Sequence, residues 1–149
     1  MARRTSLKES ACPVARGMEA IGDCWSMLII RDAMMGKKRF GEFQKSLGVA
    51  KNILSTRLRA LVDDGLLKLE PAEDGGAYQD YLLTEKGRAV FPIMIALRQW
   101  AEDYAFTPGE ETNIMVDRKS GQRIGKLELH AADGRLLNYG DTTIKPAIA

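Results

Sequence analysis

Four polar side chains fall on one arc if the residues following position 50 form a helix: Asn52, Ser55, Thr56 and Arg59. Amide, hydroxyl and guanidinium groups are the ones that hydrogen-bond base edges in the DNA major groove, Asn to adenine, Arg to guanine, and Ser or Thr to either. Lys51 stands at the predicted start of this helix, where free N–H groups favour a phosphate. The alternative is a polar face that only contacts water.

Basic residues concentrate around this arc. Between positions 37 and 59, seven Lys and Arg residues face one acidic residue, Glu42, so the window is +6 while the whole chain is +2. Lys37, Lys38 and Arg39 form a basic connector just ahead of the predicted helices. A cation placed at a phosphate releases condensed counterions, so the window favours double-stranded DNA as a partner. The alternative is a solvated lysine-rich surface.

The elements that must position these residues follow from hydrophobic periodicity and from glycine stops. Helices are predicted over 13–21, from the Asp23 cap to Gly36, over 40–47, and from Lys51 to Gly65. The last two are joined only by residues 48–50, which is a helix-turn-helix spacing. A β-hairpin pairing 66–70 with 79–84 follows, and then a long helix to about residue 106, kinked at Pro92. The fold class is therefore α+β, mainly α: a winged helix-turn-helix.

Three segments are expected along the chain. Residues 1–11 form a flexible arm, residues 12–106 form the DNA-binding and dimerisation domain, and residues 107–149 form a small β-rich extension after Pro108. In the extension, short extended runs occur at 114–116, 124–130 and 136–137. Its role is left open by the sequence.

The sequence lacks the motifs that several classes of enzyme and metal-binding protein require. No G-x-S-x-G, phosphate-binding loop or HExxH motif occurs, and the lone histidine His130, expected at the surface, leaves no catalytic or zinc-ligand set, so no enzyme, metal or cofactor is expected. The longest apolar run, 89–97, is nine residues. About 18 are needed to span a membrane. With no visible secretory leader and only two cysteines, a cytoplasmic protein is expected.

Six spaced motifs resemble those of HxlR-type transcriptional regulators, relatives of the MarR regulators. They are Cys12-Pro13-Val14, Ile21-Gly22-Asp23-Cys24-Trp25, Arg39-Phe40-Gly41-Glu42-Phe43, Leu54 through Arg57-Leu58, Asp64-Gly65-Leu66 and Tyr81-Leu82-Leu83-Thr84-Glu85-Lys86-Gly87. The resemblance covers about residues 12–105. It implies a homodimeric, sequence-specific regulator, repressor or activator, on a pseudo-palindromic operator, with a possible small-molecule effector.

The resemblance also implies which helices form the dimer. Helices 13–21 and 85–105 would pair across the dimer axis, through Val14, Met18, Met94, Leu97 and Trp100. The alternative is that the apolar side of 85–105 covers the core of one subunit. Further alternatives for the whole chain are a small thiol-dependent enzyme and a winged-helix module for protein contacts.

Two departures from the family pattern concern DNA binding. The wing tip carries Glu73 and Asp74 and no cation, so a phosphate contact by the wing is in doubt. Ala50 stands where relatives often have Ser or Thr, so the recognition helix lacks a cap that contributes about 1 kcal/mol.

The two cysteines carry different expectations. Cys12, at a helix N-terminus, is a candidate redox sensor because that position favours the thiolate; the alternative is a small buried residue. Cys24, beside Trp25, is expected to be buried and inert.

Overall fold

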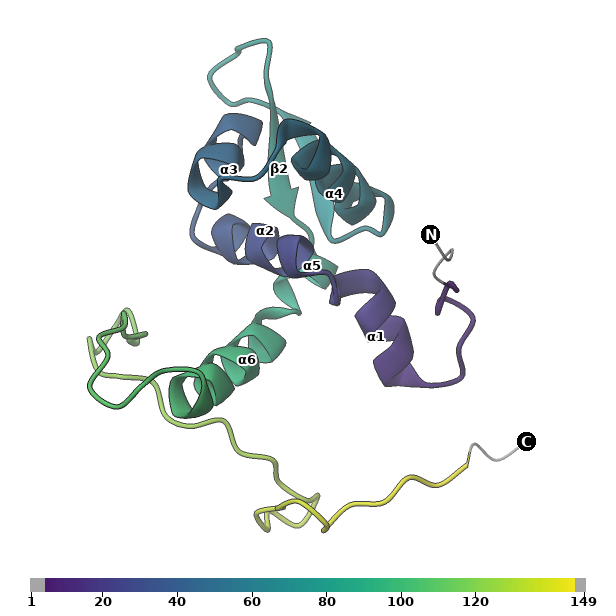
Figure 1. Ribbon diagram of the computed structural model, residues 1–149, viewed down its shortest axis with the longest axis vertical. Helices are drawn as coiled ribbons and strands as arrows, with labels where there is room; N and C mark the ends of the chain where they lie inside the picture. The colour runs from purple at the N-terminus through teal and green to yellow at the C-terminus, as the bar shows by residue number, and fades with distance from the viewer. Residues whose placement is uncertain (1–4, 147–149) are drawn as a thin grey trace. The chain divides into compact units, whose positions relative to one another are not determined.

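The computed structural model describes residues 5–146 and divides after Met94 into two compact units. In chain order, its elements are α1 (Pro13–Ile21), α2 (Cys24–Met34), α3 (Phe40–Leu47), α4 (Lys51–Asp63), β1 (Leu67–Pro71), β2 (Gln79–Leu83), α5 (Glu85–Arg88) and α6 (Phe91–Tyr104) (Figure 1). The first four helices and the hairpin agree with the sequence prediction to within about two residues. The winged helix-turn-helix fold is confirmed.

Local sequence sets the helix boundaries. The Asp23 carboxylate accepts the Ser26 N–H at the start of α2, as an N-cap should. The α3 helix ends at Gly48, whose φ of 62° lies in the left-handed region that glycine adopts without a Cβ clash. At Ala50, no side chain caps α4, as expected from its lack of an acceptor. The turn between α3 and α4 is therefore fixed by Gly48 and by Val49, which is buried.

The core of the first unit lies where α2, α3, α4 and the hairpin meet. Its fully buried side chains are Ile29, Ile30, Phe43, Leu54, Leu58, Leu61, Leu66 and Leu67. The leucine stripe predicted for α4 is thus the face that packs inward. Burying one such side chain contributes about 1.5–3 kcal/mol, so this cluster holds the helix-turn-helix rigidly.

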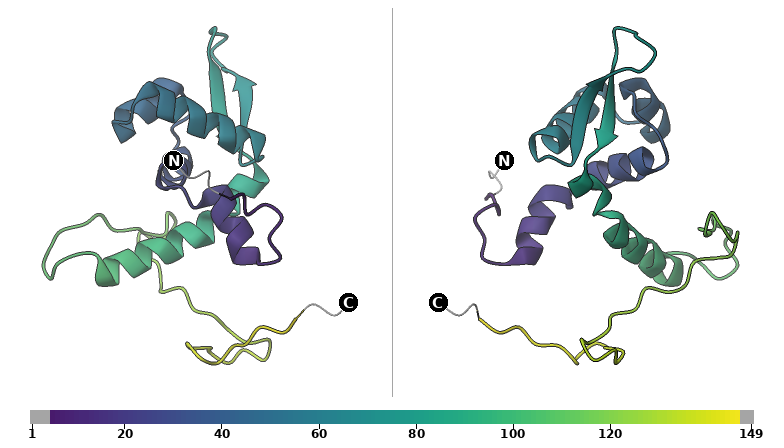
Figure 2. Two further views of the ribbon diagram at one scale, coloured as in Figure 1. Left: turned by 45° about the vertical axis from the view of Figure 1, so that its right-hand side comes forward. Right: turned by 180° about the vertical axis from the view of Figure 1, so that it is seen from behind.

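The hairpin is antiparallel, with Leu67 opposite Leu83 and Leu69 opposite Tyr81. Its tip projects past α3 and α4 in all views, as a wing does (Figure 2). Tyr81 packs edge-on against Phe43, with ring centroids 6.4 Å apart, and its N–H donates to the Lys38 carbonyl at 2.7 Å. The wing is therefore attached both to the core and to the basic connector.

The long helix expected after the wing is two helices. Thr84 accepts the Gly87 N–H and donates to the carbonyls of Gly65 and Leu66, which holds α5 against the end of α4. A Cβ at Gly87 would collide with the Leu66 carbonyl oxygen, so this close approach requires glycine. The helix then breaks at residues 89–90, and Pro92 becomes the second residue of α6, where its missing N–H costs nothing. The predicted kink at Pro92 is thus a complete break placed just before it.

The second unit consists of most of α6 and the segment that follows it. The β character expected there is limited to two isolated antiparallel bridges, Val116 with Arg123 and His130 with Leu136. His130 lies half-exposed beside Glu128. No helix in residues 5–146 is long and apolar enough to cross a membrane.

Residues 1–4 of the expected N-terminal arm lie outside the described residues. In the remainder of the arm, the Leu7 N–H and the Ser6 hydroxyl donate to the Glu19 carboxylate on α1.

Candidate nucleic-acid interface

The outer face of α4 presents the whole predicted polar arc to solvent. Asn52, Ser55, Thr56 and Arg59 are exposed, while Leu54, Leu58 and Leu61 on the opposite side are 0–1% exposed. Lys51, at the first position of the helix, is exposed as well. The buried leucines therefore fix the rotation of α4, and the polar face stays accessible to a ligand.

Two features of this face cannot be predicted from helical periodicity. The Thr56 hydroxyl donates to the Asn52 carbonyl at 2.8 Å, so its proton is already engaged within the helix and only its oxygen lone pairs are available. Ile53 is 38% exposed beside the arc. An apolar group there suits the methyl group of a thymine. The sequence analysis missed it because isoleucine is expected in the core.

The cations of the basic window fall into two sets. Lys37, Lys45, Lys51 and Arg59 form no ion pair with any residue from 5 to 146, and the last three are exposed. Lys38, Arg39 and Arg57 are each paired with an aspartate. Arg57 contacts Asp23 at 3.4 Å. Charge alone did not separate these sets, because the aspartates lie outside the window in sequence.

Arg39 connects the start of α3 to the wing. Its guanidinium contacts Asp74 at 2.7 Å and Asp80 at 3.3 Å, and it lies over the Tyr78 ring at 6.0 Å. Lys38 reaches the same Asp80 at 3.3 Å. Asp80 is 2% exposed, so this carboxylate is compensated by two cations, as a buried charge must be.

The acidic wing tip therefore has a structural role in this chain. The hydrogen bond from Arg39, supported by the Gly76 N–H, lowers the pKa of Asp74, and the same two aspartates raise the pKa of Arg39. Glu42 accepts the N–H groups of Lys38 and Arg39, which lowers its pKa. These contacts hold the connector and the wing in one arrangement.

A pocket of about 340 Å³ opens behind the basic connector. Ala33, Tyr81 and Leu83 provide apolar walls, and its charged lining residues are all cations: Lys37, Lys38, Lys68 and Arg88. Such a lining suits a small organic anion. No cluster of His, Cys, Asp and Glu suited to a metal ion occurs in the described part of the chain.

Both cysteines are exposed and free. The prediction that Cys24 is buried is wrong: it is the first residue of α2, and the helix turns Ser26, Ile29 and Ile30 inward instead. The alternative of a buried Cys12 is also wrong, since Cys12, the residue just before α1, is exposed.

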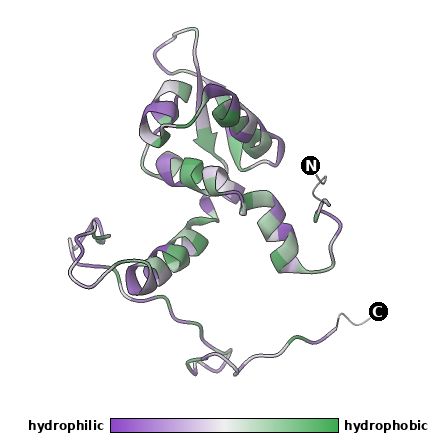
Figure 3. Cartoon of the chain, in the orientation of Figure 1, coloured by the Kyte–Doolittle hydropathy of each residue, from purple (hydrophilic) through white to green (hydrophobic). Residues whose placement is uncertain are grey.

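Four of the five residues expected at a dimer interface are exposed, and one is half-buried. Val14, Met18, Leu97 and Trp100 are 72%, 49%, 50% and 60% exposed, whereas Met94 is half-buried and packs against the core. Figure 3 shows the hydrophobic residues along α6, where Phe91, Ile93 and Tyr104 are exposed too. The alternative of a helix that covers its own core holds for Met94 alone among these five.

Comparison with known proteins places this geometry among transcriptional regulators. Residues 20–108 match the HxlR-like helix-turn-helix family. The uncharacterized HTH-type transcriptional regulator Rv3095 of Mycobacterium tuberculosis is 39% identical over 95 residues, which are 64% of this chain. The chain spans only 60% of the length of that relative.

Two solved structures extend the comparison. The crystal structure of PA1607, a candidate transcription factor, is 54% identical and covers 96% of this chain and 100% of its own, with a TM-score of 0.92. The redox regulator HypR in its reduced form is 30% identical, covers 63% of this chain and 94% of its own, and has a TM-score of 0.58.

Proposed function

Because the chain belongs to the HxlR-like helix-turn-helix family, it is a transcriptional regulator of the winged-helix type, and we propose that it binds a pseudo-palindromic operator in double-stranded DNA as a homodimer. The observation that carries this proposal is the outer face of α4, where exposed polar side chains and the unpaired Lys51 and Arg59 share one rigid helix. Residues 12–106 would provide both DNA binding and dimerisation.

The α4 helix enters the major groove in this proposal. Arg59 binds guanine and Asn52 binds adenine. Ser55 donates to or accepts from either base, and the Thr56 oxygen accepts a hydrogen bond from either base. Ile53 contacts a thymine methyl group. The free N–H groups at the uncapped start of α4, together with Lys51, bind a backbone phosphate.

Phosphate contacts are shared unequally among the basic residues. Lys37 and Lys45, which have no acidic partner among the described residues, neutralise phosphates directly. Lys38 and Arg39 bind DNA less strongly than their charge suggests, because Asp74 and Asp80 already compensate them. Their larger contribution is to fix the wing.

Dimerisation would bury the exposed faces of α1 and α6. A single short recognition helix contacts too few base pairs for useful specificity, whereas two helices related by a twofold axis read two half-sites about 10 bp apart. The apolar side chains of α6 provide a face that a second copy matches by symmetry.

Binding to duplex DNA is tested by selecting ligands from a randomised pool and measuring affinity at several salt concentrations. The expected result is a selected site with twofold symmetry and a linear fall of log affinity with log salt. Sedimentation in parallel gives the mass of the free protein. A salt-independent affinity, or selected sequences without symmetry, would contradict the proposal.

A thiol signal is compatible with the exposed cysteines. HypR is described as a redox regulator, and in this chain Cys12 lies exposed at the start of α1, one of the proposed dimer helices. Modification of Cys12 would then shift one recognition helix relative to the other. Treatment with diamide should change DNA affinity in the wild type but not in Cys12→Ser. Cys24→Ser is the matched control, since Cys24 is also exposed but lies on α2.

A small organic anion is the alternative signal, and the cation-lined pocket behind the connector supports it. Such a ligand would compete with phosphate for Lys37. Titration with benzoate, with benzyl alcohol as the uncharged control, distinguishes this pocket from a nonspecific apolar site. Equal binding of both compounds, or of neither, would contradict it.

A further inference from the structure

The chain exposes more surface than its mass explains. Its accessible area is 11777 Å² for 16.5 kDa. A compact monomer of this mass exposes roughly 7,600 Å², and two separately compact halves would expose roughly 9,100 Å². The excess over the second figure is about 2,700 Å². It exceeds the roughly 800 Å² that each partner buries in a standard interface.

Much of the exposed apolar surface lies in the segment after α6. None of the described residues from 107 to 146 is buried, and the two bridges are the segment's only β pairing. Its exposed large apolar side chains are Ile114, Val116, Leu127, Leu129, Leu136, Tyr139 and Ile144. An isolated bridge without a core does not hold a chain segment in place in water.

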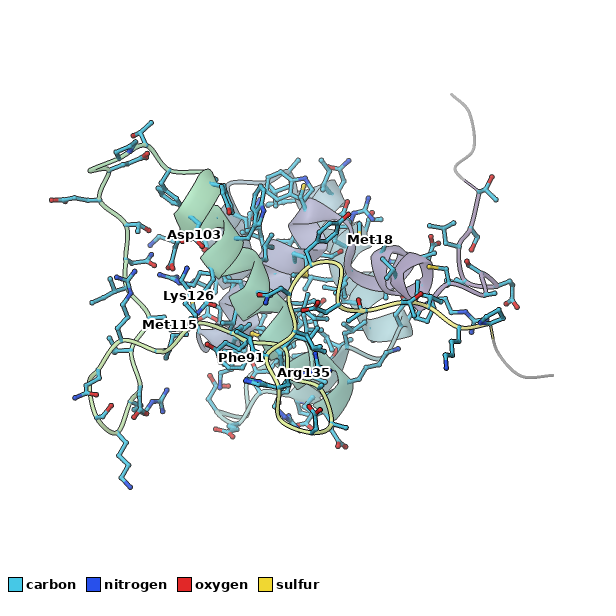
Figure 4. All side chains as sticks on the ribbon, turned by 90° about the horizontal axis from the view of Figure 1, so that it is seen from below. Met18, Phe91, Asp103, Met115, Lys126 and Arg135 are labelled. Atoms are coloured by element: carbon cyan, nitrogen blue, oxygen red, sulfur yellow. The ribbon has the colours of Figure 1, made fainter. Side chains whose placement is uncertain are left out.

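Polar contacts join the segment to α6, and Met115 and Ile124 of the segment are half-buried beside them. The Gln99 amide donates to the Gly125 carbonyl at 3.0 Å and accepts the Leu127 N–H at 2.8 Å. Lys126 pairs with Asp103 on α6 at 2.8 Å (Figure 4). Arg98 and Arg123 both contact Glu102. The exposed pair of Lys126 with Asp103 contributes little to stability. The polar contacts orient the segment against α6, and the large apolar side chains of the segment named above stay exposed to solvent.

The same conformation recurs in a crystal. The match to PA1607 covers 96% of this chain with a TM-score of 0.92, and residues 1–94 alone are too few to reach that coverage. A segment without its own core that recurs in a relative must be supported by contacts that one copy of the chain does not supply. Leu97, Trp100 and Tyr104 of α6 are exposed, lie in the same unit as this segment, and provide the adjoining half of such a surface.

We propose that residues 107–146 are an embracing arm that packs its apolar side chains on a second copy of the chain, so that the second unit is complete only in the dimer. This inference rests on the homodimer proposed above. Residues after 107 then continue the α6 interface rather than forming an independent β domain.

The arm is tested on the full-length protein with paired variants. Leu129 is 63% exposed, and Leu129→Asp should weaken dimerisation at least tenfold in sedimentation. Lys119→Asp introduces the same side chain at an exposed polar position of the arm and should leave the dimer unchanged. Amide exchange over residues 114–137 should become faster when the wild type is diluted below its dissociation constant.

Lysine cross-linking of dimers mixed from heavy- and light-isotope chains locates the partner. Lys119 and Lys126 should link to the chain of the opposite isotope. A dimer that Leu129→Asp does not weaken, with fast exchange in the arm at every concentration, would overturn the arm and leave the homodimer standing. A wild type that stays monomeric at micromolar concentration would overturn the homodimer itself and with it the arm.

Discussion

Two parts of the basic window carry the same kinds of side chain in opposite electrostatic states. On α4, Lys51 and Arg59 are exposed and unpaired among the described residues; at the connector, Lys38 and Arg39 are held by Asp74 and Asp80 of the wing. A cation with an acidic partner must lose that partner, or share it, before it can neutralise a phosphate. The unpaired cations of α4 are therefore available to DNA, whereas the paired cations of the connector fix the position of the wing.

The largest effect is expected at the unpaired arginine. Arg59→Ala should weaken binding to the selected operator by about 1–3 kcal/mol and relax the base preference at one position of each half-site, because the side chain is not engaged elsewhere. Fluorescence anisotropy against single-base operator variants measures both effects. Arg118→Ala, an exposed arginine of the second unit, is the control, and equal losses in the two variants would remove the distinction.

Next is the buried carboxylate of the wing. Asp80→Asn should lower the free energy of unfolding by about 1–2 kcal/mol, because it removes the charge that accepts a hydrogen bond from Arg39 and forms an ion pair with Lys38. Denaturant unfolding measures the loss. Glu111→Gln, at an exposed position of the second unit with no ion pair in the described residues, should stay within about 0.5 kcal/mol of the wild type. A wing that unfolds no more easily without Asp80 would mean that the ion pairs do not hold it.

Two neighbouring lysines provide a matched pair for the salt dependence. Lys37→Ala should reduce the slope of log affinity against log salt by about 0.9, the value of one phosphate contact, and Lys38→Ala should reduce it by less. The reason is that Lys38 contacts Asp80 and Lys37 has no ion-pair partner in residues 5–146. Titrations between low and physiological salt give the slopes. Equal slopes in the two variants would contradict the comparison.

Release of Arg39 should work in the opposite direction. Asp74→Asn removes the exposed half of the pairing, so Arg39 becomes available to the DNA backbone and the salt slope should steepen by up to about 0.9. Nonspecific duplexes should gain affinity as much as the operator. Glu73→Gln removes the same charge one residue away, where the carboxylate forms no ion pair with Arg39, and should have a smaller effect.

The smallest effect concerns pH. The pKa of Asp74 is lowered in the folded protein, so its stabilising contact is fully present above its ordinary pKa of 3.8 and is lost as the pH falls through the lower folded value. The stability difference between the wild type and Asp74→Asn should therefore be full at pH 7, shrink as the pH falls below about 4, and be lost once the pH is below the lowered pKa of the folded protein. Unfolding curves at both pH values measure it; a difference that persists at low pH would mean that the charge is not its source.

Local pattern was sufficient for most of the first unit. The α4 stripe of Leu54, Leu58 and Leu61 and the stops at Gly48 and Gly65 predicted both helices of the motif, because periodicity and left-handed glycines act over a few residues. The break before Pro92 was not predicted. The close approach of Gly87, on α5, to the Leu66 carbonyl was not predicted either, because it joins segments about 20 residues apart.

The candidate interface also combines features set by local sequence with features set by long-range contacts. The sequence by itself determined which side chains of α4 face outward, since burial of the leucines fixes the rotation of the helix. Only the tertiary structure decided which cations are compensated, because Asp74 and Asp80 reach Lys38 and Arg39 across 35 to 42 positions of chain through the hairpin. It also decided that Cys24 is exposed, because side-chain burial depends on which neighbouring elements cover a helix end, and that information is not contained in the residues next to it.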